Sequence, residues 1–134
     1  MKTYSLDSNI VTYCLRNDKV VIDKLNIVRK NGYRIDISPI VYYETIRGLS
    51  DVNSLQKLRL FNSFCQKLTI GTIEQDVAET AASIYVSLKR VGRLAEDADI
   101  LIAAYCVMND FVLVTHNTKH FENIDKLLIE GWCS

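Results

Sequence analysis

Asp97-Ala98-Asp99-Ile100-Leu101-Ile102-Ala103-Ala104 places two carboxylates in front of an apolar segment that continues to Met108. Apolar residues recur in it at the three- and four-residue spacing of one helix face, and others fill the remaining sides. We therefore expect a helix that the core encloses nearly all round. The face consists of Ile100, Ala103, Ala104, Val107 and Met108. Because two acids begin this helix, negative charge lies at the edge of the core, and other groups are expected to gather there.

The composition is that of one ordinary globular domain. The chain has 134 residues, of which 49% are hydrophobic and 24% are charged, and this length suits a single core. Sixteen basic and sixteen acidic residues cancel, so the net charge does not indicate nucleic-acid binding. The first apolar run ends at Asp7 and is too short for a signal peptide or a membrane span. We expect one domain over residues 1–134, in the cytoplasm and without membrane contact.

Short apolar runs alternate with stretches of helical periodicity along the chain. Strands are expected at residues 2–6, 34–37, 68–70, 111–115 and 127–130. Helices are expected at residues 8–15, 19–30, 39–48, 55–65 and 73–91, in addition to the helix that Asp97 and Asp99 begin. Ser38-Pro39 is a typical helix start, with serine as N-cap and proline in the first turn. This alternation predicts an α/β fold with a small, mostly parallel sheet and many helices.

Ligands of such sheets bind at the carboxyl ends of the strands. Asp7 ends the first expected strand, and Thr115-His116-Asn117 end the valine-rich one. These two strand ends should therefore meet in one crevice.

Three acids, Asp7, Glu44 and Asp99, stand at element starts or on otherwise apolar helices. Asp7 could simply cap the next helix, and Asp99 could simply be an acid that the dipole stabilises at a helix N-terminus. Glu44 lies inside a helix and caps nothing, although it could pair with Arg47. Carboxylates gathered in one crevice repel each other unless a cation neutralises them, and oxygen ligands suit Mg²⁺ or Mn²⁺. Such sites activate water and hold phosphate oxygens, which indicates nuclease or phosphatase chemistry.

Four segments, in the right order, resemble the motifs of PIN-domain ribonucleases, especially toxins of the VapC type. The first has an aspartate after a strand, the second a glutamate in a Gly-ended helix, and the third an aspartate before a double alanine. The fourth follows the valine-rich strand, and Gly131-Trp132 fits the family's last strand. The four segments are Leu6–Ile10, Ser38–Gly48, Asp99–Ala104 and Leu113–Phe121. The likeness spans residues 2–132, and four motifs in order are strongly specific.

The resemblance implies a single PIN domain over residues 1–134, with a three-layer α/β/α fold. It implies a Mg²⁺-dependent endoribonuclease, with Mn²⁺ able to substitute, that leaves 5′-phosphate and 3′-hydroxyl ends. It further implies the dimeric toxin of a type II toxin–antitoxin pair. RNA, for example tRNA or rRNA, would be the substrate. The partner would be a VapB-like antitoxin whose C-terminal segment fills the groove.

The resemblance assigns Asp7, Glu44 and Asp99 to the metal site, with Asn117 as the fourth catalytic residue. The family often has aspartate at this fourth position. Asparagine can bind through its carbonyl or a water but brings no charge, so three negative charges suit one Mg²⁺ better than two.

Six further residues are candidates for lesser roles. Thr115 could orient Asn117 or a metal-bound water, and Ser8 stands beside Asp7; Asp97 is expected mainly as the helix cap. Candidate RNA contacts are Arg93, Arg90 and His116, although charges at a helix end are also typical of a solvated face. His116 and His120 are expected in the loop after the strand, where the helical alignment of a zinc-binding pair is missing.

Two other functions remain open from the sequence. A catalytically silent PIN-like binding protein would not need Asp7, Glu44 and Asp99. A receiver-like Mg²⁺-binding signalling domain would need paired acids after the first strand, where Ser8 and Asn9 follow Asp7 instead.

Overall fold

The computed structural model describes residues 2–133. Its five strands form one sheet in the order β3-β2-β1-β4-β5, and every pairing in it is parallel. The strands are β1 (Thr3–Leu6), β2 (Arg34–Ile37), β3 (Thr69–Ile70), β4 (Val112–Val114) and β5 (Leu128–Glu130). All five expected strands are therefore confirmed, with ends that differ by one residue or less from the expectation.

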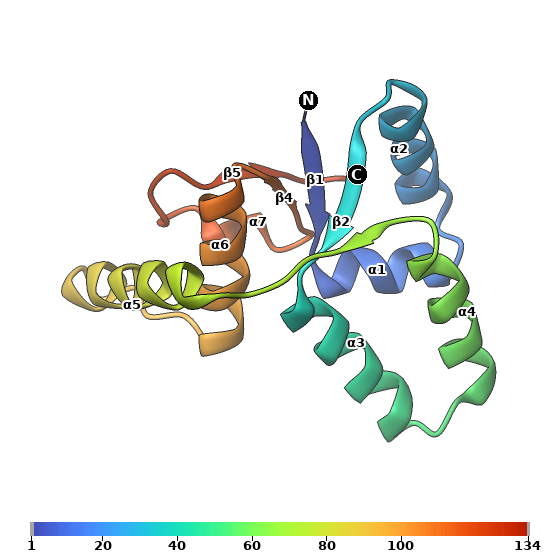
Figure 1. Ribbon diagram of the computed structural model, residues 1–134, viewed down its shortest axis with the longest axis horizontal. Coiled ribbons are helices and arrows are strands. Elements are labelled where there is room, and N and C mark those ends of the chain that lie inside the picture. Colours follow the sequence, from blue (N-terminus) through green and yellow to red (C-terminus); the bar gives the residue numbers. More distant parts are fainter. Residues whose placement is uncertain (1, 134) are drawn as a thin grey trace.

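Helices cover the sheet on two sides. Figure 1 shows α1 to α4 gathered on one side of the strands and α5 to α7 on the other. The helices are α1 (Ser8–Leu15), α2 (Lys19–Lys30), α3 (Pro39–Asp51), α4 (Leu55–Cys65), α5 (Gln75–Arg90), α6 (Asp97–Asn109) and α7 (Thr118–Phe121). The expected three-layer α/β/α fold is confirmed. Within residues 2–133, no helix is long and apolar enough to cross a membrane.

The strand order reverses between β1 and β4. The chain runs outward from β1 to β2 and β3, and then returns to the other side of β1 with β4. Leu6 pairs with Val114, and the amide of Asp7 donates to the carbonyl of Val114 at 2.8 Å. The carboxyl ends of β1 and β4 are thus adjacent at the switch point where such sheets open a crevice.

Local sequence explains where most helices begin. Four of them have an N-cap side chain that accepts a hydrogen bond from a backbone N–H of the first turn, a group that would otherwise lack a partner. The caps are Asp7, Asp18, Ser38 and Ser54. Ser38 accepts from the amide of Val41 at 3.2 Å, with Pro39 at the first helical position. The predicted Ser-Pro helix start is confirmed.

Two helix ends differ from the prediction. Helix α3 passes through Gly48 and continues to Asp51. The left-handed residue that follows it is Asn53, with φ of 51°, and the amides of Asn53 and Ser54 donate to carbonyls of the last turn. An asparagine thus closes the helix as glycine usually does. Helix α5 is shorter than expected, and Val91 is its exposed C-cap rather than part of its buried face.

Helix α6 is enclosed less completely than its sequence suggests. Ile100, Ala103 and Ala104 are buried, but Met108 near its end is 41% exposed. The expectation that Asp97 caps this helix is wrong. The extended residue before the helix is Glu96, and Asp97 is already its first helical residue. The cap position therefore lies one residue earlier than the acid pair indicated.

A buried polar network fastens α6 to the sheet. Asp36 on β2 is 2% exposed and accepts hydrogen bonds from the Ser5 hydroxyl at 2.7 Å and the Tyr105 hydroxyl at 2.6 Å. Burial raises the pKa of Asp36, and the two hydrogen bonds oppose that shift. A Cβ at Gly71 would overlap the Tyr105 hydroxyl, so glycine leaves room for it. The network joins β1, β2 and the helix that carries Asp99.

Replacing Tyr105 should show how much this network stabilises the fold. Tyr105→Phe removes a hydrogen bond to a buried carboxylate, so we expect the free energy of unfolding to fall by about 1.5–3 kcal/mol. Urea denaturation measures the change. The control is Tyr43→Phe, because Tyr43 is 58% exposed. Equal stability of the Tyr105→Phe and Tyr43→Phe proteins would contradict a stabilising role for the network.

Candidate active site

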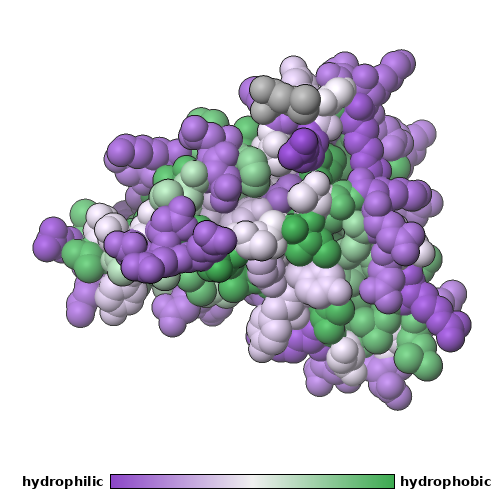
Figure 2. Space-filling model, viewed as in Figure 1, coloured by the Kyte–Doolittle hydropathy of each residue, from purple (hydrophilic) through white to green (hydrophobic). Residues whose placement is uncertain are grey.

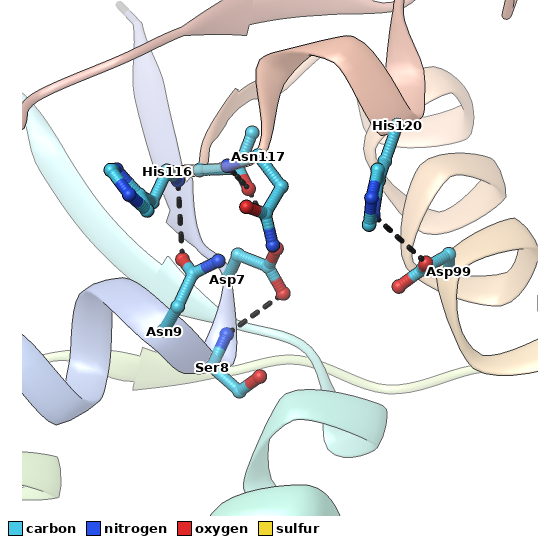
Figure 3. Close-up of polar contacts among 8 residues, drawn as sticks. Asp7, Ser8, Asn9, Asp99, His116, Asn117 and His120 are labelled. Atoms are coloured by element: carbon cyan, nitrogen blue, oxygen red, sulfur yellow. Dashed lines mark hydrogen bonds and ion pairs between the residues drawn. The ribbon is translucent and has the colours of Figure 1, made fainter.

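Asp7 is held at the end of β1 by donors from two strand ends. Its Oδ1 accepts from the amide of Ser8 at 2.8 Å, and its Oδ2 accepts from the Thr115 hydroxyl at 2.8 Å. The Thr115 oxygen in turn accepts from the amide of Asn117 at 3.1 Å. Figure 3 shows the Asn117 side chain directed toward the Asp7 carboxylate. The ends of β1 and β4 therefore lie side by side, as the sequence predicts, and the space between Asp7, Glu44 and Asp99 is called the crevice below.

Glu44 projects from α3 into the same region. Its Oε1 is buried and has no hydrogen-bond partner among residues 2–133. A buried polar atom without a partner costs about 1–3 kcal/mol, because it has lost its water without replacement. Its Oε1 is therefore available to a ligand.

Asp99 lies in the first turn of α6, on the other side of the crevice. Its Oδ2 is 4.0 Å from Nδ1 of His120, and its side chain is 26% exposed. Figure 3 shows His120 reaching from α7 toward this carboxylate. Asp99 is thus more open than Asp7, which is 5% exposed.

The pKa values of all three acids are raised. Burial raises the pKa of each of them. The charges of Asp7 and Asp99 raise the pKa of Glu44 further, and Asp7 does the same to Asp99. Arg47 lowers the pKa of Glu44, and His120 lowers that of Asp99, but neither reverses the shift. The crevice thus holds negative charge that the protein does not neutralise.

This arrangement fits a hard divalent cation. The donors are carboxylate and amide oxygens, which suit Mg²⁺ or Mn²⁺ rather than a soft metal. In the part of the chain that the structure describes, no three His, Cys, Asp or Glu side chains lie close enough to hold a metal by themselves. Mg²⁺ commonly keeps several waters and binds through one or two carboxylates. The unpartnered Oε1 of Glu44 within the described residues and the repulsion of Glu44 by Asp7 and Asp99 agree with such a site.

The supporting candidates lie in different places. Thr115 is buried and links Asp7 to the backbone of Asn117. Ser8 begins α1, and its side chain lowers the pKa of Glu44. Asp97 is exposed and lines a hollow against α5 with Ala81 and Tyr85. The structure thus brings Thr115 and Ser8 to the acids but turns Asp97 toward α5.

The three candidate RNA contacts lie in different parts of the structure. Arg93 lines a hollow of about 510 Å³ that Asp99 also lines, whereas Arg90 ends α5 and does not line it. His116 is exposed; its amide donates to Asn9 Oδ1 at 3.2 Å, and its ring packs edge-on against Tyr13. Of the three, Arg93 is thus the candidate that lines a hollow together with one of the acids.

The structure places His120 beside Asp99, a pairing that the sequence analysis did not predict. The loop expected for both histidines holds only for His116, because His120 lies on the one-turn helix α7. This helix begins after Asn117, and an asparagine at an N-cap position is the signal that could have revealed it. The turn of α7 directs His120 toward Asp99 and away from His116 (Figure 3).

Removing one acid should stabilise the metal-free protein. A raised carboxyl pKa means that ionisation costs stability as the pH rises through that pKa, and the cost is absent below the ordinary value of 4.5 for Glu44. In EDTA we expect Glu44→Gln to raise the melting temperature at pH 8 by about 3–5 °C, the shift that roughly 1 kcal/mol produces in a domain of this length. The gain should shrink toward pH 4.5.

Thermal melts of the two proteins across this pH range measure the effect. The matched control is Glu79→Gln, because Glu79 is an exposed glutamate on α5. A gain that stays the same from pH 4.5 to pH 8, or a loss at pH 8, would contradict charge repulsion among the acids.

Known proteins share this sequence pattern along almost their whole length. The chain is 28% identical over 131 residues to ribonuclease VapC1 of Haemophilus influenzae strain R2866, covering 96% of this chain and 97% of that protein. It is 25% identical over 134 residues to the tRNA(fMet)-specific endonuclease VapC of Shigella flexneri, covering 98% and 99% of the two chains.

A solved structure has the same fold over almost the whole chain. The crystal structure of VapBC2 from Rickettsia felis bound to a DNA fragment from their promoter contains a chain that is 27% identical to this one. The two superpose with a TM-score of 0.89 over 98% of this chain and 99% of the other. The PIN domain family model matches residues 4–127, a range that includes Asp7, Glu44, Asp99 and Asn117. The resemblance seen in the sequence is confirmed, and the chain belongs to the PIN domain family.

Proposed function

We propose that this chain is a Mg²⁺-dependent endoribonuclease, the toxin of a type II toxin–antitoxin pair. The observation that carries the proposal is the set of three carboxylates gathered near the β1–β4 switch point, with Oε1 of Glu44 buried and without a partner within residues 2–133. PIN-domain nucleases generally depend on a divalent metal. A protein that binds RNA without cutting it would have no use for three acids that destabilise one another.

The residues of the crevice divide the work. Asp7, Glu44 and Asp99 would hold the ion, directly or through water, and the Asn117 amide would add a neutral oxygen. When bound, Mg²⁺ supplies Lewis-acid chemistry that lowers the pKa of water and stabilises charge on phosphate oxygens. Thr115 and the Ser8 amide fix the Asp7 carboxylate from two sides, so its orientation is set before any ligand arrives.

The reaction is hydrolysis of one phosphodiester bond. A water oxygen attacks phosphorus, and the bond from phosphorus to the 3′ oxygen breaks. The attacking oxygen stays on the 5′-phosphate, and the leaving 3′ oxygen takes up a proton to become a hydroxyl. These are the ends that the resemblance implies.

The substrate and partner proposals follow the named relatives. The relatives are ribonucleases, one of them specific for tRNA(fMet), so RNA such as tRNA or rRNA is the proposed substrate. Arg93 is the candidate RNA contact that lies beside an acid, and Arg90 and His116 would make more distant contacts. We further propose one PIN domain over residues 1–134 and a homodimer that acts in the cytoplasm.

A VapB-like antitoxin would bind beside the crevice. A cavity of about 660 Å³ between α1, α3 and α4 has Glu44 and Ser8 in its lining. Figure 2 shows hydrophobic surface between α3 and α4, and Val52 and Leu60 in this lining are 63% and 49% exposed. The C-terminal segment of the antitoxin would fill this groove and block access to Glu44.

Cleavage of RNA by the purified protein tests the proposed function. Incubation of total RNA with Mg²⁺ should produce new 5′-phosphate ends that EDTA abolishes. Asp7→Asn should lower the cleavage rate by about 100-fold or more. Mutating a residue that only hydrogen-bonds to a metal ligand can already lower activity by up to about 100-fold, and Asp7 is proposed as a ligand itself. Asp23→Asn is the matched control, since Asp23 is an exposed aspartate on α2.

Mapping of the new 5′ ends measures both the rate and the cut site. Equal cleavage by the Asp7→Asn protein, or cleavage undiminished by EDTA, would contradict the metal mechanism. Absence of cleavage of any RNA by the wild-type protein would favour a catalytically silent PIN domain.

A further inference from the structure

A second hollow adjoins the acid crevice on its Asp99 side. It has a volume of about 510 Å³ and is lined by the turn after α5, the start of α6 and the region of α7. Three basic side chains line it: Arg93, Lys119 and His120. Asp99 belongs to the lining as well, so the hollow and the crevice share a wall. A chain bound across the acids would continue into this hollow.

The backbone fixes where Arg93 enters the hollow. Gly92 follows Val91, the C-cap of α5, and has φ of +68°, a conformation that glycine adopts without strain. The amide of Gly92 donates to the carbonyl of Lys89 at 3.1 Å, and the amide of Arg93 donates to the carbonyl of Leu88 at 2.8 Å. This pair of bonds is a Schellman motif, which reverses the chain at a defined angle. Arg93 is therefore presented by a rigid turn.

The charges of the hollow leave two cations available. His120 faces Asp99 at 4.0 Å, whereas within residues 2–133 neither Arg93 nor Lys119 lies within ion-pair distance of a carboxylate. Glu96 is the other acid in the lining. With Asp99 facing His120, the lining has one remaining negative charge, on Glu96, and two positive charges, on Arg93 and Lys119. An anion would satisfy both, and a guanidinium and an ammonium together suit phosphate oxygens.

We propose that this hollow binds the RNA phosphate next to the one that is cut, through Arg93 and Lys119. The inference rests on the proposed ribonuclease function. It adds that the RNA strand runs from the acids past Asp99 into this hollow. Phosphate fits better than a carboxylate of a protein partner, because Asp99 lines both the hollow and the crevice where a phosphodiester would be cleaved. A phosphate held here would fix the RNA backbone relative to Asp99, with His120 between the two.

Binding without cleavage gives the first arm of the test. The probe is a fluorescein-labelled single-stranded RNA of 20 mixed nucleotides in EDTA, with anisotropy measured from 50 to 300 mM salt. Each phosphate contact on a single strand contributes about 0.7 to the slope of log affinity against log salt. We expect Arg93→Ala/Lys119→Ala to weaken binding about 10-fold at low salt and to reduce the slope by about 0.7. The control is Lys24→Ala/Lys30→Ala on α2, with no change in slope.

Cleavage of chemically altered RNA gives the second arm. Once the cut site is mapped, a neutral methylphosphonate is placed at each neighbouring phosphate in turn. At one adjacent position we expect the methylphosphonate to lower kcat/KM of the wild-type protein about 10-fold relative to unmodified RNA. The same substitution should leave kcat/KM of the double variant unchanged. Such non-additivity shows that the phosphate and the two side chains interact.

The outcomes separate this inference from the proposed function. If wild-type protein cuts RNA but the double variant binds with an unchanged salt slope, the phosphate site is overturned and the ribonuclease stands. Additive losses at every phosphate position would overturn it too. If no RNA is cut, the ribonuclease proposal fails, while the binding arm still supports or overturns the phosphate site. Reduced antitoxin binding with unchanged RNA binding would assign the hollow to the protein partner instead.

Discussion

Repulsion among three partly buried carboxylates is the constraint around which this structure is arranged. Buried charges are stable only when an opposite charge or several hydrogen bonds compensate the lost water. Asp7 has two such bonds, Asp99 has a histidine 4.0 Å away, and Glu44 has a buried oxygen with no partner within residues 2–133. The protein alone leaves this charge uncompensated. A divalent cation bound there, as proposed, would remove the repulsion and give Oε1 of Glu44 a partner.

A fourth buried carboxylate shows the contrast. Asp36 is buried as deeply as Asp7, yet hydroxyl groups of Ser5 and Tyr105 satisfy it within the core. No acid is among the causes of its raised pKa. The same residue type thus serves the fold when hydroxyl groups enclose it. Asp7 and Asp99 instead contribute charge that raises the pKa of a third acid, Glu44. Destabilisation of this kind at a functional site commonly accompanies activity.

Much of this architecture follows from the sequence because the signals are local. Apolar runs mark every strand, the Ser38-Pro39 pair marks the start of α3, and the strand-end position of Asp7 implies the shared crevice. The failures occur where tertiary contacts or single backbone dihedrals decide. Asn53 rather than Gly48 closes α3, and Glu96 rather than Asp97 precedes α6. The Asp36 network was not predicted, because its partners come from β1 and α6, far away in sequence.

The most direct test of the metal site is anomalous diffraction from Mn²⁺ in crystals of the wild-type protein. A hard divalent cation should give one peak in each chain, in the crevice between Asp7, Glu44 and Asp99, because three negative charges there face one another. A map without a peak in this crevice at millimolar Mn²⁺, or with its main peak beside Asp36, would contradict the assignment of these acids to a metal site.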